Sequence, residues 1–166
     1  MTRADTTTER RWLVFGDDGS RGADIAWLWI NSHSWKALCC VDGSAHAARA
    51  LDAFAALPLA ADVAEVTVLA VDDGRVDVDV ATSTALDALH AVGVDARAER
   101  GSGAPTRIIL EHLDAQQPQL VVLGTKGLTG WRRLRLGSTA AAVVHHAACT
   151  SLLACADETG TPELDP

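Results

Sequence analysis

The stretch L-V-V-L-G-T-K-G-L-T-G-W-R-R-L-R-L-G-S, from Leu120 to Ser138, decides the fold of this chain. The four apolar residues at its start end abruptly at Gly124, which is typical of a buried parallel strand. At its end, Ser138 and Thr139 precede an alanine- and valine-rich segment, an order that predicts a helix with a hydroxyl cap. The stretch therefore predicts a strand, a glycine-rich loop and a helix in direct succession.

The glycines of this loop suit it to an anion. Gly124, Gly127 and Gly137 allow backbone amides to approach a ligand closely, and the start of the helix adds a partial positive charge. Lys126 and the arginines at positions 132, 133 and 135 add cations that can steer an anion. The alternative is a purely structural turn between strand and helix. The hydroxyls at the helix entry and the nearby cations favour the phosphate-binding interpretation.

The spacing of these residues resembles a known motif. Gly124-x-x-Gly127, nine further residues and then Gly137-Ser138 is similar to the nucleotide-binding motif of the universal stress protein family. A second block, A-L-C-C-V-D-G-S-A-H-A-A-R-A-L at positions 37–51, resembles the first strand and helix of that family. The blocks stand in the family's order, and the resemblance extends over roughly residues 36–155.

The resemblance implies an adenine nucleotide, ATP or AMP, with Mg²⁺ offsetting the charge of a triphosphate. Backbone amides of the loop and the hydroxyls of the helix entry would hold the phosphates. Asp42 would lie beside the ribose or Mg²⁺, and the backbone around Val41 and Val71 would contact adenine. The alternative for Asp42 is a structural Asx turn before Gly43. The expected nucleotide-binding residues are Val41, Asp42, Val71, Gly124, Lys126, Gly127, Gly137, Ser138 and Thr139.

Strands and helices alternate from position 36 onward, which predicts an α/β protein with a doubly wound, parallel, five-stranded sheet. The resemblance implies the strand order 3-2-1-4-5, and ligands of such sheets bind where the order reverses. The segment between Val71 and Ser83 is short for the family, so part of the wall around the ribose is expected to be missing. Expected strands are Ala37–Val41, Val63–Val71, Val94–Arg100, Gln119–Leu123 and Thr150–Cys155, and expected helices are Ala45–Leu57, Ser83–Val92, Pro105–Gln116 and Thr139–Ala147.

The N-terminal segment, residues 1–35, resembles a partial second copy of the family's first strand and helix. Asp18-Gly19-Ser20 recurs 24 residues later as Asp42-Gly43-Ser44. The copy is either a vestige of a tandem domain or an added strand–helix unit that covers a sheet edge. Either Asp-Gly-Ser could face the glycine loop, and we choose the Asp42 copy because the complete series of strands follows it. Residues 36–156 form the expected universal stress protein domain, and residues 157–166 an expected disordered tail.

The 166-residue chain carries 14 basic and 22 acidic residues, a net charge of −8, which argues against nucleic acid and anionic membranes as partners. No apolar run is long enough to cross a membrane, and the polar N-terminus lacks the apolar stretch of a signal peptide, so a cytoplasmic protein is expected. The cysteines form no C-x-x-C pair and are interpreted as small buried hydrophobes. In the family the last strand commonly pairs across a dimer, which implies a homodimer here.

The sequence does not establish catalysis. His145 and His146 are adjacent on a helix, where they make a poor chelating pair, and a structural role near the helix end is favoured. The loop is followed by no evident general base, so we expect a nucleotide-binding regulator with slow or no turnover. Two alternatives remain: a slow ATPase, and an interaction module that binds no nucleotide and uses the tryptophan-rich N-terminal segment.

Overall fold

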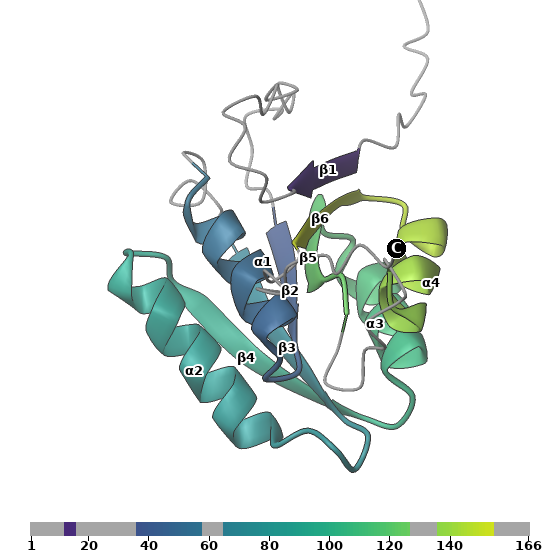
Figure 1. Cartoon of the computed structure of the whole chain (residues 1–166), viewed down its shortest axis with the longest axis horizontal. Coiled ribbons are helices and arrows are strands. Elements are labelled where there is room, and N and C mark those ends of the chain that lie inside the picture. The colour runs from purple at the N-terminus through teal and green to yellow at the C-terminus, as the bar shows by residue number, and fades with distance from the viewer. Residues whose placement is uncertain (1–11, 16–35, 58–64, 127–135, 155–166) are drawn as a thin grey trace, which may run out of the picture.

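The computed structural model describes residues 12–15, 36–57, 65–126 and 136–154, the first of these segments by its backbone alone. They form one parallel sheet of six strands in the order β1-β6-β5-β2-β3-β4 (Figure 1). From β2 onward this is the order 3-2-1-4-5, so the expected fold class is confirmed. The strands are β1 (Trp12–Phe15), β2 (Lys36–Val41), β3 (Glu65–Asp72), β4 (Ala96–Ser102), β5 (Leu120–Gly124) and β6 (Thr150–Ala154).

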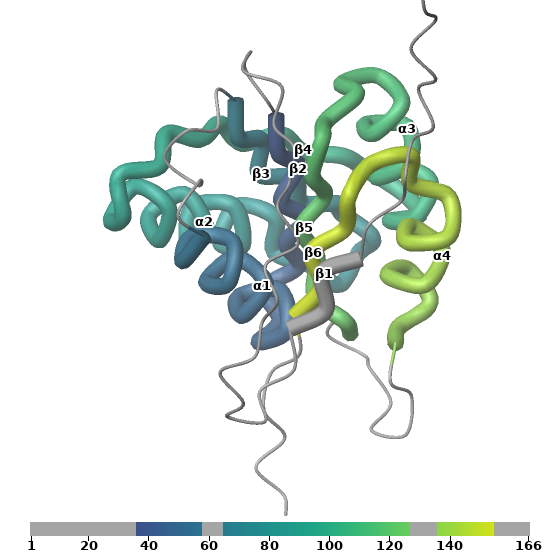
Figure 2. Tube along the Cα trace, turned by 90° about the horizontal axis from the view of Figure 1, so that it is seen from above, coloured from purple at the N-terminus to yellow at the C-terminus, as the bar shows by residue number. Residues whose placement is uncertain are grey.

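Two helices cover each face of the sheet (Figures 1 and 2). On one face, α1 and α2 bury Phe54 and Leu89, and on the other α3 and α4 bury Ile109 and Val143. The inner strands are buried on both faces, which explains their continuous apolar sequence. The helices are α1 (Ala45–Ala55), α2 (Val78–Ala91), α3 (Pro105–Gln116) and α4 (Ser138–His146).

β1 extends the sheet beyond the five expected strands. It pairs in parallel with β6, with Trp12 opposite Ser151 and Phe15 opposite Ala154 (Figure 1). A strand from the N-terminal segment therefore lies on a sheet edge, as one interpretation of the partial repeat expects. The expected helix of the repeat, the Asp18 copy, Trp27, Trp29 and the C-terminal tail lie outside the described residues.

The clearest difference from the expected elements is the start of α2, at Val78 rather than Ser83. The sequence V-D-V-D-V alternates like a strand, which obscured the helix signal. Asp77 caps the helix, because its carboxylate accepts a hydrogen bond of 3.1 Å from the amide of Val80. Asp79 in the first turn adds a charge that the helix dipole favours. The longer helix begins directly after a short loop that follows β3, and this loop lines the site described below.

Within the described residues, every helix is too short or too polar to cross a bilayer.

Candidate functional site

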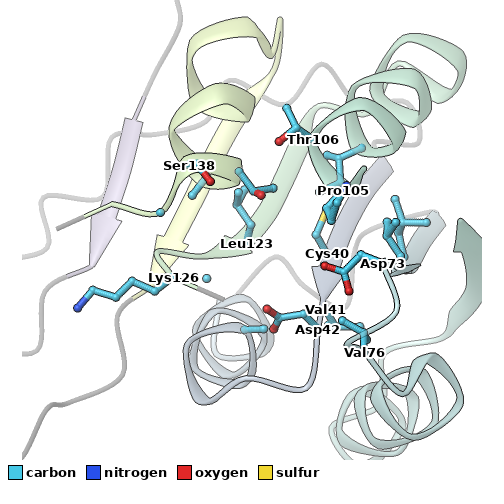
Figure 3. A pocket seen from close by; sticks show the side chains of 18 of the residues that line it. Cys40, Val41, Asp42, Asp73, Val76, Pro105, Thr106, Leu123, Lys126 and Ser138 are labelled. Carbon is cyan, nitrogen blue, oxygen red and sulfur yellow. The ribbon is translucent and has the colours of Figure 1, made fainter. Parts of the chain in front are cut away.

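A cavity of about 550 Å³ opens at the carboxyl ends of β2, β3 and β5 (Figure 3). In the sheet, β2 lies between β3 on one side and β5 on the other. The strand order reverses at β2, and the cavity lies at this point. Its volume falls within the range of roughly 300–1,000 Å³ that small-molecule sites occupy. The topology therefore brings the ends of three strands to one ligand-sized hollow.

Eight of the nine expected nucleotide-binding residues line this one cavity. They are Val41, Asp42, Val71, Gly124, Lys126, Gly137, Ser138 and Thr139. The ninth, Gly127, lies outside the described residues, as do the arginines at 132, 133 and 135. Asp42 of the second Asp-Gly-Ser copy lines the cavity, because it follows directly on β2; the Asp18 copy lies outside the described residues.

The Asp42-Gly43-Ser44 turn directs the chain from β2 into α1. The Asp42 carboxylate accepts a hydrogen bond of 2.9 Å from the Ser44 amide, and Gly43 takes a φ of 77°, which suits glycine. Ser44 then caps α1 by accepting a bond of 3.2 Å from the Ala47 amide. The structural interpretation of Asp42 as an Asx-turn residue is confirmed. Its carboxylate also borders the cavity, so this turn leaves a ligand contact open.

Gly124 has a packing reason to be glycine. A Cβ at this position would lie 2.6 Å from the Ala47 nitrogen and 2.6 Å from the His46 carbonyl carbon. Both are backbone atoms of α1, which cannot rotate away. The bare backbone of Gly124 thus lets the start of α1 pack against the end of β5, beside the cavity. The glycine at this position is therefore required by the packing of α1 against β5, in addition to any contact with a ligand.

The expected hydroxyl cap of α4 is wrong. The N-cap residue is Gly137, and neither Ser138 nor Thr139 makes a capping bond with its side chain. The cause is the contact between Gly137 and Thr125: the Gly137 amide donates to the Thr125 carbonyl over 2.6 Å, which sets the helix to begin at Ser138. One expected phosphate donor, the Gly137 amide, is therefore engaged within the protein. The hydroxyls of Ser138 and Thr139 line the cavity instead of capping the helix.

Two helix starts that no side chain caps meet at the cavity. α3 begins after Ala104 and α4 after Gly137, and neither residue offers a side-chain acceptor. By contrast, Ser44 caps α1 and Asp77 caps α2. The first amides of a helix have no partner within it, and the helix dipole makes this end partially positive. The cavity thus receives two positive helix ends, of which only the α4 end was expected from the sequence.

Lys126 lines the cavity differently from its expected role. The residue is 9% exposed, and its carbonyl accepts a bond of 3.5 Å from the Ser44 hydroxyl. In Figure 3 its side chain extends away from Asp42 and Asp73. Lys126 therefore joins the loop after β5 to the turn after β2 through its main chain, and its ammonium group points out of the cavity's centre.

Most of the apolar lining of the cavity was not predicted from the sequence. Leu69, Val76, Pro105, Ile109 and Leu123 border the cavity together with the expected Val41 and Val71. These side chains come from β3, the loop before α2, α3 and β5, and in sequence they look like ordinary core residues. The position of Leu123 near the end of a predicted parallel strand could have indicated that it lines the site. The lining residues of α3 could be identified only from the three-dimensional structure.

The loop between β3 and α2 also reaches the cavity, although a gap was expected in this wall. Asp73, Arg75 and Val76 line it. The Arg75 guanidinium donates to the Asp73 carboxylate, with Nε 3.0 Å from Oδ2, and this contact lowers the pKa of Asp73. The Asp73 side chain is 12% exposed, so its charge is held at the rim by its own neighbour. This short loop supplies both an apolar contact and an ion pair.

Among the residues that the structure describes, the remaining polar groups form no second candidate site. Burial raises the pKa of Cys40, a cavity residue, to about 12 and that of Cys149 to about 11, so both are neutral thiols. His145 and His146 stack edge to face with their ring centroids 4.7 Å apart. Over the described ranges, no three histidine, cysteine or acidic side chains are grouped to hold a metal ion.

The chain matches known proteins in sequence and in fold. Residues 78–154 match the sequence model of the Universal stress protein family, from α2 to the end of the sheet. A universal stress protein from Methanocaldococcus jannaschii is 38% identical over 61 residues. That segment covers 37% of this chain and 36% of the relative, so the match spans about a third of the relative's length.

Solved structures show the same fold. A universal stress protein family protein from Arabidopsis thaliana, with AMP bound, is 19% identical with a TM-score of 0.60, over 78% of this chain and 97% of that chain. A universal stress protein in complex with cAMP is 23% identical with a TM-score of 0.58, over 72% and 95% of the two chains. At these identities the likeness establishes the fold, and the site must be argued from this chain's own residues.

Proposed function

Because this chain carries a domain of the universal stress protein family, we propose that it binds an adenine nucleotide in the cavity and acts as a regulatory protein of the stress response. The observation that carries the proposal is the convergence of eight expected residues, from three strand ends and one helix start, on a single hollow of about 550 Å³. Residues that form only local turns would have no reason to share one cavity. AMP and cAMP in two structures of the same fold support an adenine nucleotide.

The two parts of the cavity match the two parts of a nucleotide. The apolar side chains of Val41, Val71, Val76 and Ile109 suit a flat purine ring. The first-turn amides of α4 and the hydroxyls of its first two residues suit a phosphate. In this arrangement, Asp42 lies beside the ribose. The start of α3 adds a second partially positive end to the same space.

ATP is the larger candidate ligand, and its extra phosphates require more positive charge. Asp42 and Asp73 both border the cavity, and the latter is already paired with Arg75. A triphosphate near these carboxylates needs Mg²⁺ to offset its charge, whereas AMP needs less compensation. We propose that ATP binds with Mg²⁺ and that AMP binds without it. Titration of each nucleotide with and without Mg²⁺ tests this difference.

Binding rather than turnover is the proposed activity. The groups that meet the phosphate end are hydroxyls and amides, which hold a phosphate without activating a water molecule. Phosphate release measured with ATP and Mg²⁺ should stay near the rate of the buffer control. Release that scales with protein concentration and is abolished by Asp42→Asn would establish an ATPase instead.

The decisive experiment is calorimetric titration of AMP and Mg²⁺-ATP into the wild type and a Ser138→Ala/Thr139→Val variant. We expect a loss of affinity of about 5- to 150-fold, since two hydroxyl contacts to phosphate are each worth roughly 0.5–1.5 kcal/mol. The chain offers a matched control in the adjacent pair Ser83 and Thr84, which are exposed on α2 away from the cavity. Ser83→Ala/Thr84→Val removes the same atoms and should leave both affinities unchanged.

Equal affinities in both double variants would contradict the proposed site. The absence of any binding heat in the wild type would instead favour the interaction module, which uses the fold without a nucleotide. The family resemblance implies a homodimer through the last strand, and we propose that this dimer forms only when the outer edge of that strand is free. In this chain, the outer edge of that strand is already paired with β1, which leads to the following inference.

A further inference from the structure

The two edges of the five-stranded core are protected in different ways. β4, at one edge, is rich in charge and largely exposed. Its Arg97 pairs with Glu65 and Glu99, and its Arg100 pairs with Asp79 across 2.6 Å. Charged side chains on an edge strand discourage a second sheet from pairing with it. The β4 edge therefore needs no cover.

β6, at the other edge of this core, carries no such protection. Its sequence T-S-L-L-A contains no charged residue, and Ser151 through Ala154 are buried. Without β1, this strand would present a row of unpaired backbone groups beside an apolar surface, which is a template for pairing with another chain. In the structure, the four residues of β1 fill this position along the strand from Ser151 to Ala154.

The internal repeat shows why the N-terminal segment can supply such a strand. The two copies of the repeat are offset by 24 residues, as between Asp18 and Asp42. With this offset, the residues of β1 correspond in sequence to positions 36–39, which lie in β2. Both segments form parallel strands of the same sheet. The repeat therefore has a structural consequence: its first copy contributes a strand to the sheet built by the second.

We infer that β1 is an intrachain cover that competes with a second copy of this chain for the outer edge of β6. The occupant of the edge is the chain's own strand while β1 is paired, and the β6 of another copy when β1 leaves. A tethered segment competes at an effective concentration in the millimolar range, so at micromolar protein the intrachain pairing prevails. The full-length chain is then monomeric at this edge. This inference does not depend on nucleotide binding.

The test compares the mass of the full-length chain with that of a Leu13→Pro/Val14→Pro variant by sedimentation velocity from 1 to 100 μM. Proline removes the backbone amide donor that a strand needs. The amides of consecutive residues in a strand point to opposite sides, so one of the two prolines replaces a residue whose amide faces β6. We expect the wild type at 17.4 kDa and the variant at twice that mass, increasingly so with concentration. Thr6→Pro/Thr7→Pro, which lies before β1, is the matched control and should stay monomeric.

A wild type that is already dimeric, or a natively folded β1 variant that stays monomeric, would overturn the inference. If the proline variant does not fold, a pair of introduced cysteines tests the inference instead. Leu13 lies directly opposite Leu152, so Leu13→Cys/Leu152→Cys should form a disulfide within one chain after mild oxidation, as peptide mapping by mass spectrometry can show. Trp12→Cys/Ala154→Cys, two positions that the register of β1 and β6 keeps apart, is the control. A bond found exclusively between chains, or equal yields in both variants, would count against the cover.

Discussion

The two halves of the cavity are built from different parts of the chain. One half consists of apolar side chains, among them Val41, Val71 and Val76, at the ends of β2 and β3 and in the loop before α2. The other half consists mainly of main chain and short hydroxyl side chains between β5 and α4, with Gly124, Gly137 and Ser138. The first half can change shape by one side chain at a time. The second is fixed by close approaches of backbone, so a change there acts on the fold as well.

Because the two halves differ in this way, the effects of substitutions on stability and on ligand binding can be separated. A substitution in the main-chain half should reduce stability whenever it adds an atom, and reduce binding alone when it removes a hydroxyl. A substitution in the side-chain half should act on the ligand's base and little on its phosphate.

Gly124→Ala should destabilise the protein most. The added Cβ would lie 2.6 Å from two backbone atoms at the start of α1, which can yield only by moving the helix. We expect a loss of about 3 kcal/mol or more in the free energy of unfolding, measured by urea denaturation. Gly137→Ala is the matched comparison. Its Cβ would approach the Thr125 carbonyl oxygen to 3.2 Å, a milder contact, and should cost about 1 kcal/mol.

Equal stabilities for the two alanine variants would show that the approach of α1 to β5 is not what requires glycine at position 124. In that case, Gly124 would be retained for the ligand, and a normal unfolding curve with lost AMP binding would identify this role.

Two serines near helix starts should separate stability from binding. Ser44→Ala removes the cap of α1 and should lower the free energy of unfolding by about 1 kcal/mol. Ser138→Ala removes no capping bond and should leave the unfolding curve unchanged, while AMP binds about fivefold more weakly. Adenosine, which lacks the phosphate, should bind Ser138→Ala as it binds the wild type. Destabilisation by Ser138→Ala comparable to that of Ser44→Ala would contradict the geometry of the α4 start.

The thiol of Cys40 makes the side-chain half sensitive to high pH. Burial raises the pKa of Cys40 from 9.0 to about 12, so the folded protein keeps a proton that the unfolded chain releases above pH 9. The contribution of the protonated Cys40 thiol to the free energy of unfolding is fully present below pH 9 and declines as the pH rises toward 12. Between pH 9 and 10, the wild type should lose roughly 1 kcal/mol more stability than Cys40→Val. Parallel pH profiles for the two proteins would show that this thiol is not shielded from water in the folded state.

The same division explains what could be predicted from the sequence. The main-chain half could be predicted in part because close backbone approach restricts the choice of residue, as at Gly124. The alternation of strands and helices predicted a parallel sheet, and the family resemblance implied the order of the strands from β2 to β6, which is the order observed. These signals are local, since each depends on a few consecutive residues.

The side-chain half was hidden because an apolar residue has the same sequence pattern in a core as in a ligand wall. Ile109 and Leu123 differ from their buried neighbours only by lying where the strand order reverses. The hydroxyl cap of α4 was predicted wrongly for a related reason. The contact of Gly137 with Thr125 joins two residues on either side of the loop, and no residue type announces it.

Val76→Ala gives the smallest predicted effect and tests the side-chain half most directly. Val76 is half-buried at the rim of the cavity, and removal of two methyl groups should cost less than about 1 kcal/mol of binding, a two- to fourfold loss. Because the lost contact is to the base, AMP and adenosine should weaken by the same factor, unlike their response to Ser138→Ala. Val80→Ala, the same change on a residue 58% exposed and outside the cavity lining, is the control for both titrations. A loss confined to AMP would place the phosphate, rather than the base, beside Val76 and would reverse the proposed orientation of the nucleotide.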